Sequence, residues 1–175
     1  MTKVLFSGNI DIFYGQFYID VLDSEDDDYL DMESAFEKQN NGLCGACHKG
    51  KLFFVVGPQD GAAKVTVELH ESEPNLIDSF DDIVECSFLA NTNDLHLCEW
   101  AHEATHNLNL PSGEYIVRYS AKKIDMDYGE DDDWETPIEG QEYIIQFWPG
   151  KLPSDKILQT NTTVGQYWHK EMGSQ

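Results

Sequence analysis

Apolar and polar residues alternate over several short stretches of the chain, and this alternation is typical of half-buried β-strands. Turn-forming glycine, proline and asparagine residues separate the stretches. The predicted strands lie at residues 10–22, 51–57, 64–72, 82–90, 113–124 and 141–150. Gly15 interrupts the first of them, where we expect a β-bulge. Cys86 falls on the apolar side of its stretch, and we expect it to be a small core residue.

Helical patterns are few and short. The sequence predicts two helical turns over residues 32–39 and a second helix that begins at Ser154. Because strands dominate and do not alternate with helices, the pattern favours a mostly β fold, an antiparallel β-sandwich-like domain with one or two short helices. With 175 residues, of which 41% are hydrophobic, the chain fits a single acidic β-rich domain over residues 1–175.

Charge narrows the classes of function. The 33 Asp and Glu residues against 11 Lys and Arg give a formal net charge of −22. A field of this sign repels nucleic acid and anionic membranes, and it speeds association with basic surfaces. We therefore expect a basic protein partner, no direct binding of nucleic acid and no membrane binding. The sequence contains neither a long apolar stretch nor a signal-peptide pattern, so we expect a cytoplasmic location.

The acidic residues concentrate in two segments, near residues 20–33 and 125–135, which we predict to be loops. An aromatic residue adjoins the acids in each segment, and aromatic side chains carry much of the binding energy at the centres of interfaces. The predicted partner-binding residues are Asp26, Asp27, Asp28, Tyr29, Asp31, Asp131, Asp132, Asp133 and Trp134.

Two other interpretations of the acidic segments stay open. Carboxylates in loops between strands can bind Ca²⁺, a hard cation that takes oxygen ligands. The second segment does not fit the spacing of an EF-hand, because Gly129 and Thr136 occupy the fifth and twelfth positions counted from Asp125. The segments could also be solvated loops that only aid solubility.

Residues 102–106, His-Glu-Ala-Thr-His, match the HExxH pattern of zinc metallopeptidases. That chemistry requires a helix, in which His102 and His106 bind one zinc ion and Glu103 acts on the bound water. A helix here would extend at most over residues 97–107 and would place Cys98 on the same face. Because the segment lies between a strand and the turn "LPSGEY", we favour a surface connector, and we assign no catalytic residue, no metal ligand and no cofactor.

Cys44, Cys47 and His48 match both the thioredoxin-type and the c-type haem patterns. A redox CxxC motif requires a position at the start of a helix, where the helix N-terminus lowers the pKa of the thiol. Here the turn-like "EKQNNG" precedes the motif and the apolar "LFFVVG" follows it. We therefore expect a loop with ordinary free thiols.

Two stretches resemble the competence protein J family, small acidic inhibitors of a DNA-entry nuclease. The stretch "IDIFYGQFYI" is similar to an early strand of that family with an aromatic-Gln-Phe centre. A later stretch is similar to the family's apolar-x-Leu-Pro-x-Gly-x-Tyr turn, which leads into a strand. The matching residues are Tyr14, Gln16 and Phe17 in the first stretch and Leu108, Leu110, Pro111, Gly113 and Tyr115 in the second. The resemblance implies a β-rich fold and inhibition of a nuclease.

We predict a binding protein that inhibits, or confers immunity to, a basic enzyme, above all a nuclease. Its carboxylates would occupy the positions at which the enzyme binds phosphates. The alternatives are a zinc-dependent hydrolase that uses residues 102–106, and a calcium-binding β-sandwich interaction module.

Overall fold

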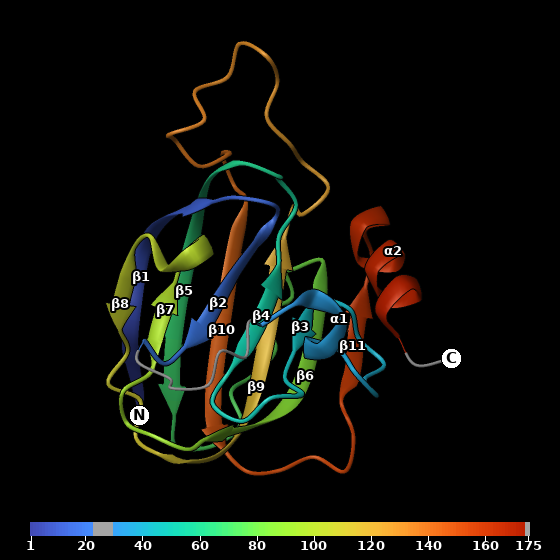
Figure 1. The fold of residues 1–175 in the computed structure, drawn as a ribbon. Helices are drawn as coiled ribbons and strands as arrows, with labels where there is room; N and C mark the ends of the chain where they lie inside the picture. Colours follow the sequence, from blue (N-terminus) through green and yellow to red (C-terminus); the bar gives the residue numbers. More distant parts are fainter. Residues whose placement is uncertain (23–29, 174–175) are drawn as a thin grey trace.

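The alternating stretches of the sequence form two β-sheets that pack face to face (Figure 1). The computed structural model describes residues 1–22 and 30–173. In these residues the larger sheet has the strand order β1-β5-β10-β9-β6-β11. Its strands are β1 (Thr2–Ile12), β5 (Gly61–His70), β10 (Glu142–Pro149), β9 (Gly113–Lys122), β6 (Asp82–Ala90) and β11 (Lys156–Thr160). The prediction of a mostly β fold is confirmed.

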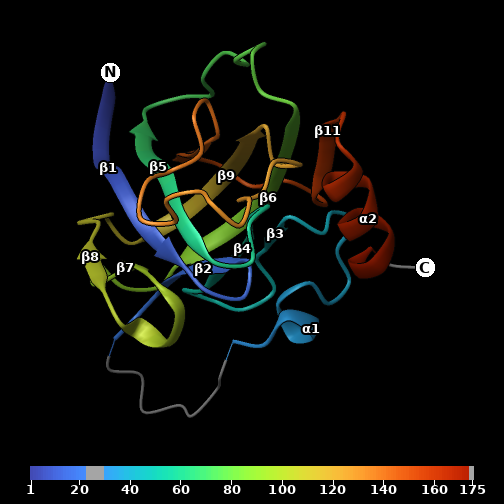
Figure 2. The same ribbon diagram turned by 90° about the horizontal axis from the view of Figure 1, so that it is seen from above.

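The smaller sheet has the strand order β3-β4-β2-β7-β8. Its strands are β3 (Cys44–Gly45), β4 (Leu52–Val55), β2 (Gln16–Asp20), β7 (His96–Cys98) and β8 (Thr105–Asn107). The described helical elements are α1 (Met32–Ala35), the 3₁₀ turn η1 (Trp100–His102) and α2 (Thr163–Met172). Both views place α2 beside β11, at one edge of the larger sheet (Figures 1 and 2).

Neighbouring strands are antiparallel throughout the described sheets, with the exception of β10 and β5, which run parallel. Because β6 is antiparallel to β9 and β9 to β10, β6 runs in the same direction as β5. Residues 71–81, which join β5 to β6, must therefore travel from one end of the larger sheet to the other.

Aromatic residues fill the space between the two sheets. Phe17 and Phe54 both belong to the smaller sheet, and their ring centroids lie 4.9 Å apart. The ring centroid of Phe54 also lies 5.0 Å from that of Tyr119, which belongs to the larger sheet. The Tyr119 hydroxyl donates a 2.8 Å hydrogen bond to the carbonyl of Val55. Buried polar groups are costly without a partner, so this bond permits a tyrosine at the centre of the core and ties the two sheets together.

The outer face of the larger sheet buries an arginine. The Arg118 side chain donates hydrogen bonds to the Glu85 carboxylate at 2.8 Å and to the carbonyl of Pro74 at 2.8 Å. It also pairs with Glu73 at 3.1 Å, and its guanidinium lies 5.0 Å from the ring centroid of Trp148. Only 1% of Arg118 is exposed, because residues 71–81 cover it. An alternating pattern alone would have assigned Arg118 to solvent.

Three predictions about elements need correction or extension. The predicted strand over residues 10–22 is two strands, since Gly15 lies in a tight turn between β1 and β2 and not in a bulge. The helix predicted from Ser154 is wrong, because residues 156–160 pair with β6 as β11 and the helix begins only at Thr163. Helix α1 ends earlier than predicted, and Lys38 beyond it has a left-handed φ of 61°.

The remaining predicted strands are confirmed within a few residues, and Cys86 is buried as predicted. None of the helices in the described residues is long and apolar enough to cross a membrane.

Loss of the Arg118 side chain should destabilise the fold, since Glu85 would keep a buried charge without its partner. We expect Arg118→Met to lower the free energy of unfolding by about 3–5 kcal/mol, measured by urea denaturation. The double variant Arg118→Met/Glu85→Met should recover much of this loss, because no buried charge remains. Lys170→Met removes an exposed cation of α2 and serves as the control. A loss in Arg118→Met no larger than in the control would contradict the assigned role.

Candidate partner-binding surface

Four connections gather at the end of the sandwich at which β1, β4, β7 and β9 finish, and we name it the acidic end (Figure 2). They are residues 13–15, 56–60, 99–104 and 123–141. The last of these, the acidic loop, projects well beyond both sheets (Figure 1).

Tyr128 anchors the acidic loop to the start of β5. Its hydroxyl accepts a hydrogen bond from the N–H of Ala62 at 3.1 Å and lies 2.8 Å from the Ala62 carbonyl. Gly61 beneath the ring has a φ of 131°, and a Cβ atom there would lie 2.2 Å from the ring. Glycine is therefore required for the tyrosine to dock.

Turns stabilised by aspartates hold the tip of the acidic loop. The Asp133 carboxylate accepts hydrogen bonds from the N–H of Glu135 and the hydroxyl of Thr136, at 3.0 and 2.7 Å. These bonds, led by that from Thr136, lower the pKa of Asp133. Asp132 accepts a bond from the N–H of Gly129. Two of the predicted partner-binding carboxylates thus shape the loop itself.

All four predicted residues of this loop, Asp132 and Asp133 included, are exposed. Asp131 is exposed, as are its neighbours Glu130 and Glu135. Trp134 is 49% exposed, its indole N–H donates to the Gly129 carbonyl at 3.3 Å, and its ring lies 6.2 Å from that of Tyr128. The loop therefore presents carboxylates and one tryptophan on a backbone held from both sides.

Asp31 has a structural role in the fold. It caps α1, accepting hydrogen bonds from the N–H and the hydroxyl of Ser34 at 2.9 and 2.8 Å, and these bonds lower its pKa. Helix α1 lies apart from the acidic loop, so Asp31 does not join residues 131–134 in one patch (Figure 1). The predicted residues Asp26, Asp27, Asp28 and Tyr29 lie outside the described residues.

The HExxH segment is not a helix. Residues 97–107 contain the end of β7, the 3₁₀ turn η1 and β8. The His102 imidazole lies 3.3 Å from the Asp20 carboxylate, whereas His106 packs its ring against Phe6 at 4.7 Å. Burial raises the pKa of the Cys98 thiol to about 12. The one-face arrangement required by the zinc-hydrolase hypothesis is absent, and the described residues hold no group of three or more His, Cys, Asp and Glu side chains suited to a metal ion.

Cys44 does not begin a helix. It lies buried in β3, where burial raises its pKa well above the ordinary value, and its carbonyl accepts a bond from the Cys86 thiol at 3.2 Å. Cys47 is exposed. Both are free thiols, as predicted, although Cys44 belongs to a strand and not to a loop.

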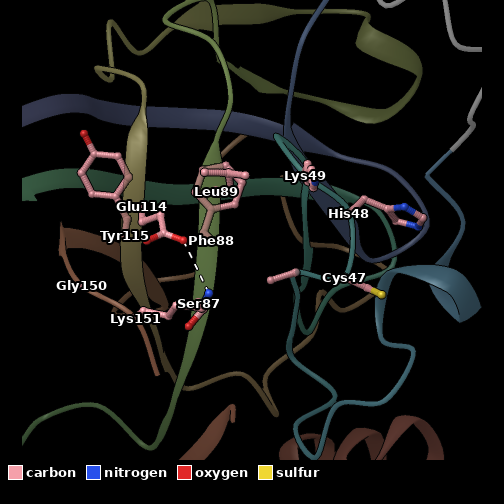
Figure 3. Close-up of a pocket in the computed structure, with 11 residues that line it drawn as sticks. Cys47, His48, Lys49, Ser87, Phe88, Leu89, Glu114, Tyr115, Gly150 and Lys151 are labelled. Carbon is pink, nitrogen blue, oxygen red and sulfur yellow. Dashed lines mark ion pairs between the residues drawn. The ribbon is translucent and has the colours of Figure 1, made fainter. Parts of the chain in front are cut away.

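Cys47 borders a shallow hollow of about 220 Å³ (Figure 3). Lys49 and Lys151 also line it, and the Lys151 ammonium lies 3.6 Å from the Glu114 carboxylate. The hollow lies where β9 begins and β10 has ended, opposite the acidic end.

Sequence reasoning missed two aromatic residues of the acidic end. The rings of Tyr14 and Trp100 come from the β1–β2 turn and from η1, and their centroids lie 5.0 Å apart. The glycine after Tyr14 was the available signal, because an x-Gly pair between alternating strands is typical of a two-residue hairpin turn. No local pattern indicates that the ring of Trp100 would contact that of Tyr14.

Two solved structures resemble this fold, although no protein-family model and no curated protein matches the sequence. The first is ComJ from Bacillus subtilis, an inhibitor of the DNA-degrading activity of NucA. The TM-score is 0.60 with 21% sequence identity, over 86% of this chain and 99% of ComJ. The fold is similar to that of ComJ. The second is the protein of crocagin biosynthetic gene J, with a TM-score of 0.53, 18% identity and the same coverage of both chains.

The resemblance to the competence protein J family, predicted from two short stretches, is confirmed at the level of the fold. In the second stretch, Leu108 and Leu110 are buried, and the Tyr115 hydroxyl donates a 2.8 Å bond to the Pro111 carbonyl. In the first stretch, Phe17 is fully buried between the sheets. These residues belong to the framework of the fold, whereas Tyr14 of the first stretch is 63% exposed.

Glu99 at the acidic end should make stability depend on pH. Its side chain accepts a 2.9 Å bond from the N–H of Asp11, only 7% of the residue is exposed, and burial raises its pKa. A raised carboxyl pKa stabilises the fold at low pH, and this contribution is lost as the pH rises through the folded-state value. Glu99→Gln keeps the acceptor and removes the charge.

We expect Glu99→Gln to raise the melting temperature at pH 7 by about 2–4 °C. The difference should vanish below pH 4.5, the ordinary glutamate pKa, because both states of the wild type are then protonated. Scanning calorimetry at several pH values measures both effects, and Glu171→Gln at an exposed position of α2 is the control. An unchanged melting temperature at pH 7 would show that Glu99 carries no desolvated charge.

Proposed function

We propose that this protein inhibits a nuclease by placing its acidic end in the groove through which the enzyme binds nucleic acid. The observation that carries the proposal is an ordered, projecting acidic loop on a fold similar to that of ComJ, whose described activity is inhibition of a DNA-degrading enzyme. The partner is accordingly a basic protein, and the chain has the role of an inhibitor or immunity protein and not of an enzyme.

Electrostatics support this role. A nuclease groove attracts polyanions, and carboxylates on a protein surface can occupy the positions of phosphates. Glu130, Asp131 and Glu135 are exposed on a loop whose shape is fixed by Tyr128 and Asp133. A loop ordered before binding loses little conformational entropy on association, which favours affinity.

The same charge disfavours other partners. With a net charge of −22 the chain repels DNA and anionic lipid, so its effect on nucleic acid would pass through a protein. A cytoplasmic location is part of this proposal. The HExxH segment fits a binding protein. His102 pairs with Asp20, and β7 and β8 on either side of the turn serve as scaffold.

NucA is the first nuclease to test, since the structurally similar ComJ inhibits it. DNA degradation by NucA would be followed while this protein is added in increasing amounts. We expect inhibition that reaches completion near one inhibitor per nuclease and weakens as salt rises. Full nuclease activity at a large excess of the protein would contradict the proposal for this target.

Neutralising the exposed acids of the loop should slow association. The variant Glu130→Gln/Asp131→Asn/Glu135→Gln leaves Asp132 and Asp133 in place, so the turns of the loop remain. We expect its association rate constant with NucA to fall by about tenfold at low salt, with little change in dissociation. The difference from the wild type should narrow as salt screens the charges.

The matched control is Glu37→Gln/Asp78→Asn/Glu171→Gln, which removes the same net charge at exposed positions away from the acidic loop. Surface plasmon resonance at several salt concentrations measures both rate constants. Equal slowing in the two triple variants would assign the effect to net charge and remove the specific role of the loop.

A further inference from the structure

We propose that the tips of two hairpins at the acidic end form a socket for one lysine or arginine side chain of the basic partner. The rings of Tyr14 and Trp100 form its aromatic part, and Asp11, Glu99 and Glu103, which lie in or beside the same two hairpins, supply its carboxylates. This inference rests on the proposed function and names the anchor that the acidic loop alone does not supply.

The backbone fixes the first tip. Tyr14 and Gly15 both have left-handed φ angles, 59° and 67°, as in a type I′ turn. The N–H of Gly15 donates to the Gln59 carbonyl at 2.8 Å, and the Gly15 carbonyl accepts from Val56 at 3.0 Å. The turn is thereby tied to the neighbouring β4–β5 connection, and the Tyr14 side chain projects from a fixed base.

The second tip repeats this geometry without glycine. Ala101 and His102 have φ angles of 53° and 56°, and the N–H of Glu103 donates to the Trp100 carbonyl at 3.2 Å. A left-handed conformation costs a residue with a Cβ about 1–2 kcal/mol. Ala101 and His102 are exposed, so packing of the core does not require these side chains there. Backbone strain of this kind concentrates at functional sites.

The two tips bring the rings together. The Tyr14 and Trp100 planes meet at 53°, so the rings are tilted against each other and not stacked flat. Tyr14 is 63% exposed, and Phe13 beside it is also exposed. Tyrosine and tryptophan are the residues most enriched at binding hot spots, and their faces attract ammonium and guanidinium groups.

The charges around the rings select the ligand. The Glu99 carboxylate accepts the N–H of Asp11 at 2.9 Å, and the N–H of Glu103 donates to the Trp100 carbonyl at 3.2 Å, so acidic residues from both hairpins lie close to the aromatic pair. Burial and the neighbouring carboxylates of Asp11 and Glu103 raise the pKa of Glu99 and so disfavour its ionised form, which a cation placed beside it would favour. An apolar side chain would fill the aromatic part and leave the carboxylates without a counter-charge, so a basic side chain fits best.

The socket and the acidic loop belong to one surface. Gly15 contacts Gln59, and the chain then enters β5 at Gly61 and Ala62, the residues on which Tyr128 rests. A basic partner that covers the loop would thus meet the aromatic pair across this short connection. Rim carboxylates act mainly on the association rate, whereas a central aromatic anchor acts on dissociation.

The main test variant is Tyr14→Gly. It removes the ring and relieves the left-handed backbone, so the fold should be retained and its melting temperature should not fall. We expect the affinity for NucA to fall by about 30-fold, mostly through faster dissociation. Tyr14→Phe keeps the ring and should bind within about threefold of the wild type. Trp100→Leu, with its melting temperature measured alongside, should weaken binding like Tyr14→Gly.

Helix α2 offers the matched control. Tyr167, which is 53% exposed, forms another aromatic pair with the half-buried Trp168, with ring centroids 4.9 Å apart, on an element separate from the two hairpins. Tyr167→Ala should leave the affinity unchanged. If the wild type binds NucA and Tyr14→Gly and Trp100→Leu bind equally well, the socket is overturned while the proposed function stands.

A second probe keeps the inference testable if the wild type does not bind NucA. Hexa-arginine amide would be titrated into ¹⁵N-labelled protein, with the indole N–H resonance of Trp100 assigned through Trp100→Leu. A shift of that resonance in the wild type that is lost in Tyr14→Gly would support the socket, although the nuclease target would be wrong. Absence of a shift in the wild type would overturn it.

Discussion

The structure depends on a guanidinium buried on the outer face of its larger sheet. Arg118 joins Glu85 of β6 to Glu73 and Pro74 of the crossing connection, and Trp148 of β10 lies against its guanidinium. Three central strands and the segment that covers them thereby become one unit. The acidic loop connects β9 to β10, two strands of this unit. Both ends of this long projecting segment are therefore attached to strands that the Arg118 contacts hold in place.

The excess of acids over bases is accommodated largely without salt bridges. Aspartates at several turns and helix ends accept hydrogen bonds from backbone N–H groups, which carry partial positive charge. Asp31 caps α1, Asp125 binds the first N–H groups of α2, and Asp155 binds the N–H groups of Asn40 and Asn41. A chain so short of cations can thus hold its loops in place with its acids, and the acids left over are those available to a partner.

The sequence predicted the central strands well because their residues that face the smaller sheet are regularly apolar. Residues 82–90 form β6 as predicted, because Val84, Cys86 and Phe88 recur at every second position and are buried in the core. The features that the sequence failed to predict are edge strands and contacts between residues far apart in the chain. Residues 2–9 and 156–160 form edge strands with exposed side chains, where burial leaves little pattern. The sequence pattern assigns Arg118 to the surface, because it does not show that residues 71–81 cover this side chain.

The candidate surface shows the same division between local and long-range information. Composition located the acidic loop, but it could not separate Asp131 from Asp132 and Asp133, which are equally exposed and also hold the turns. That separation depends on where particular N–H groups point. The meeting of Tyr14 with Trp100 depends on two hairpins far apart in the sequence, which no local pattern encodes.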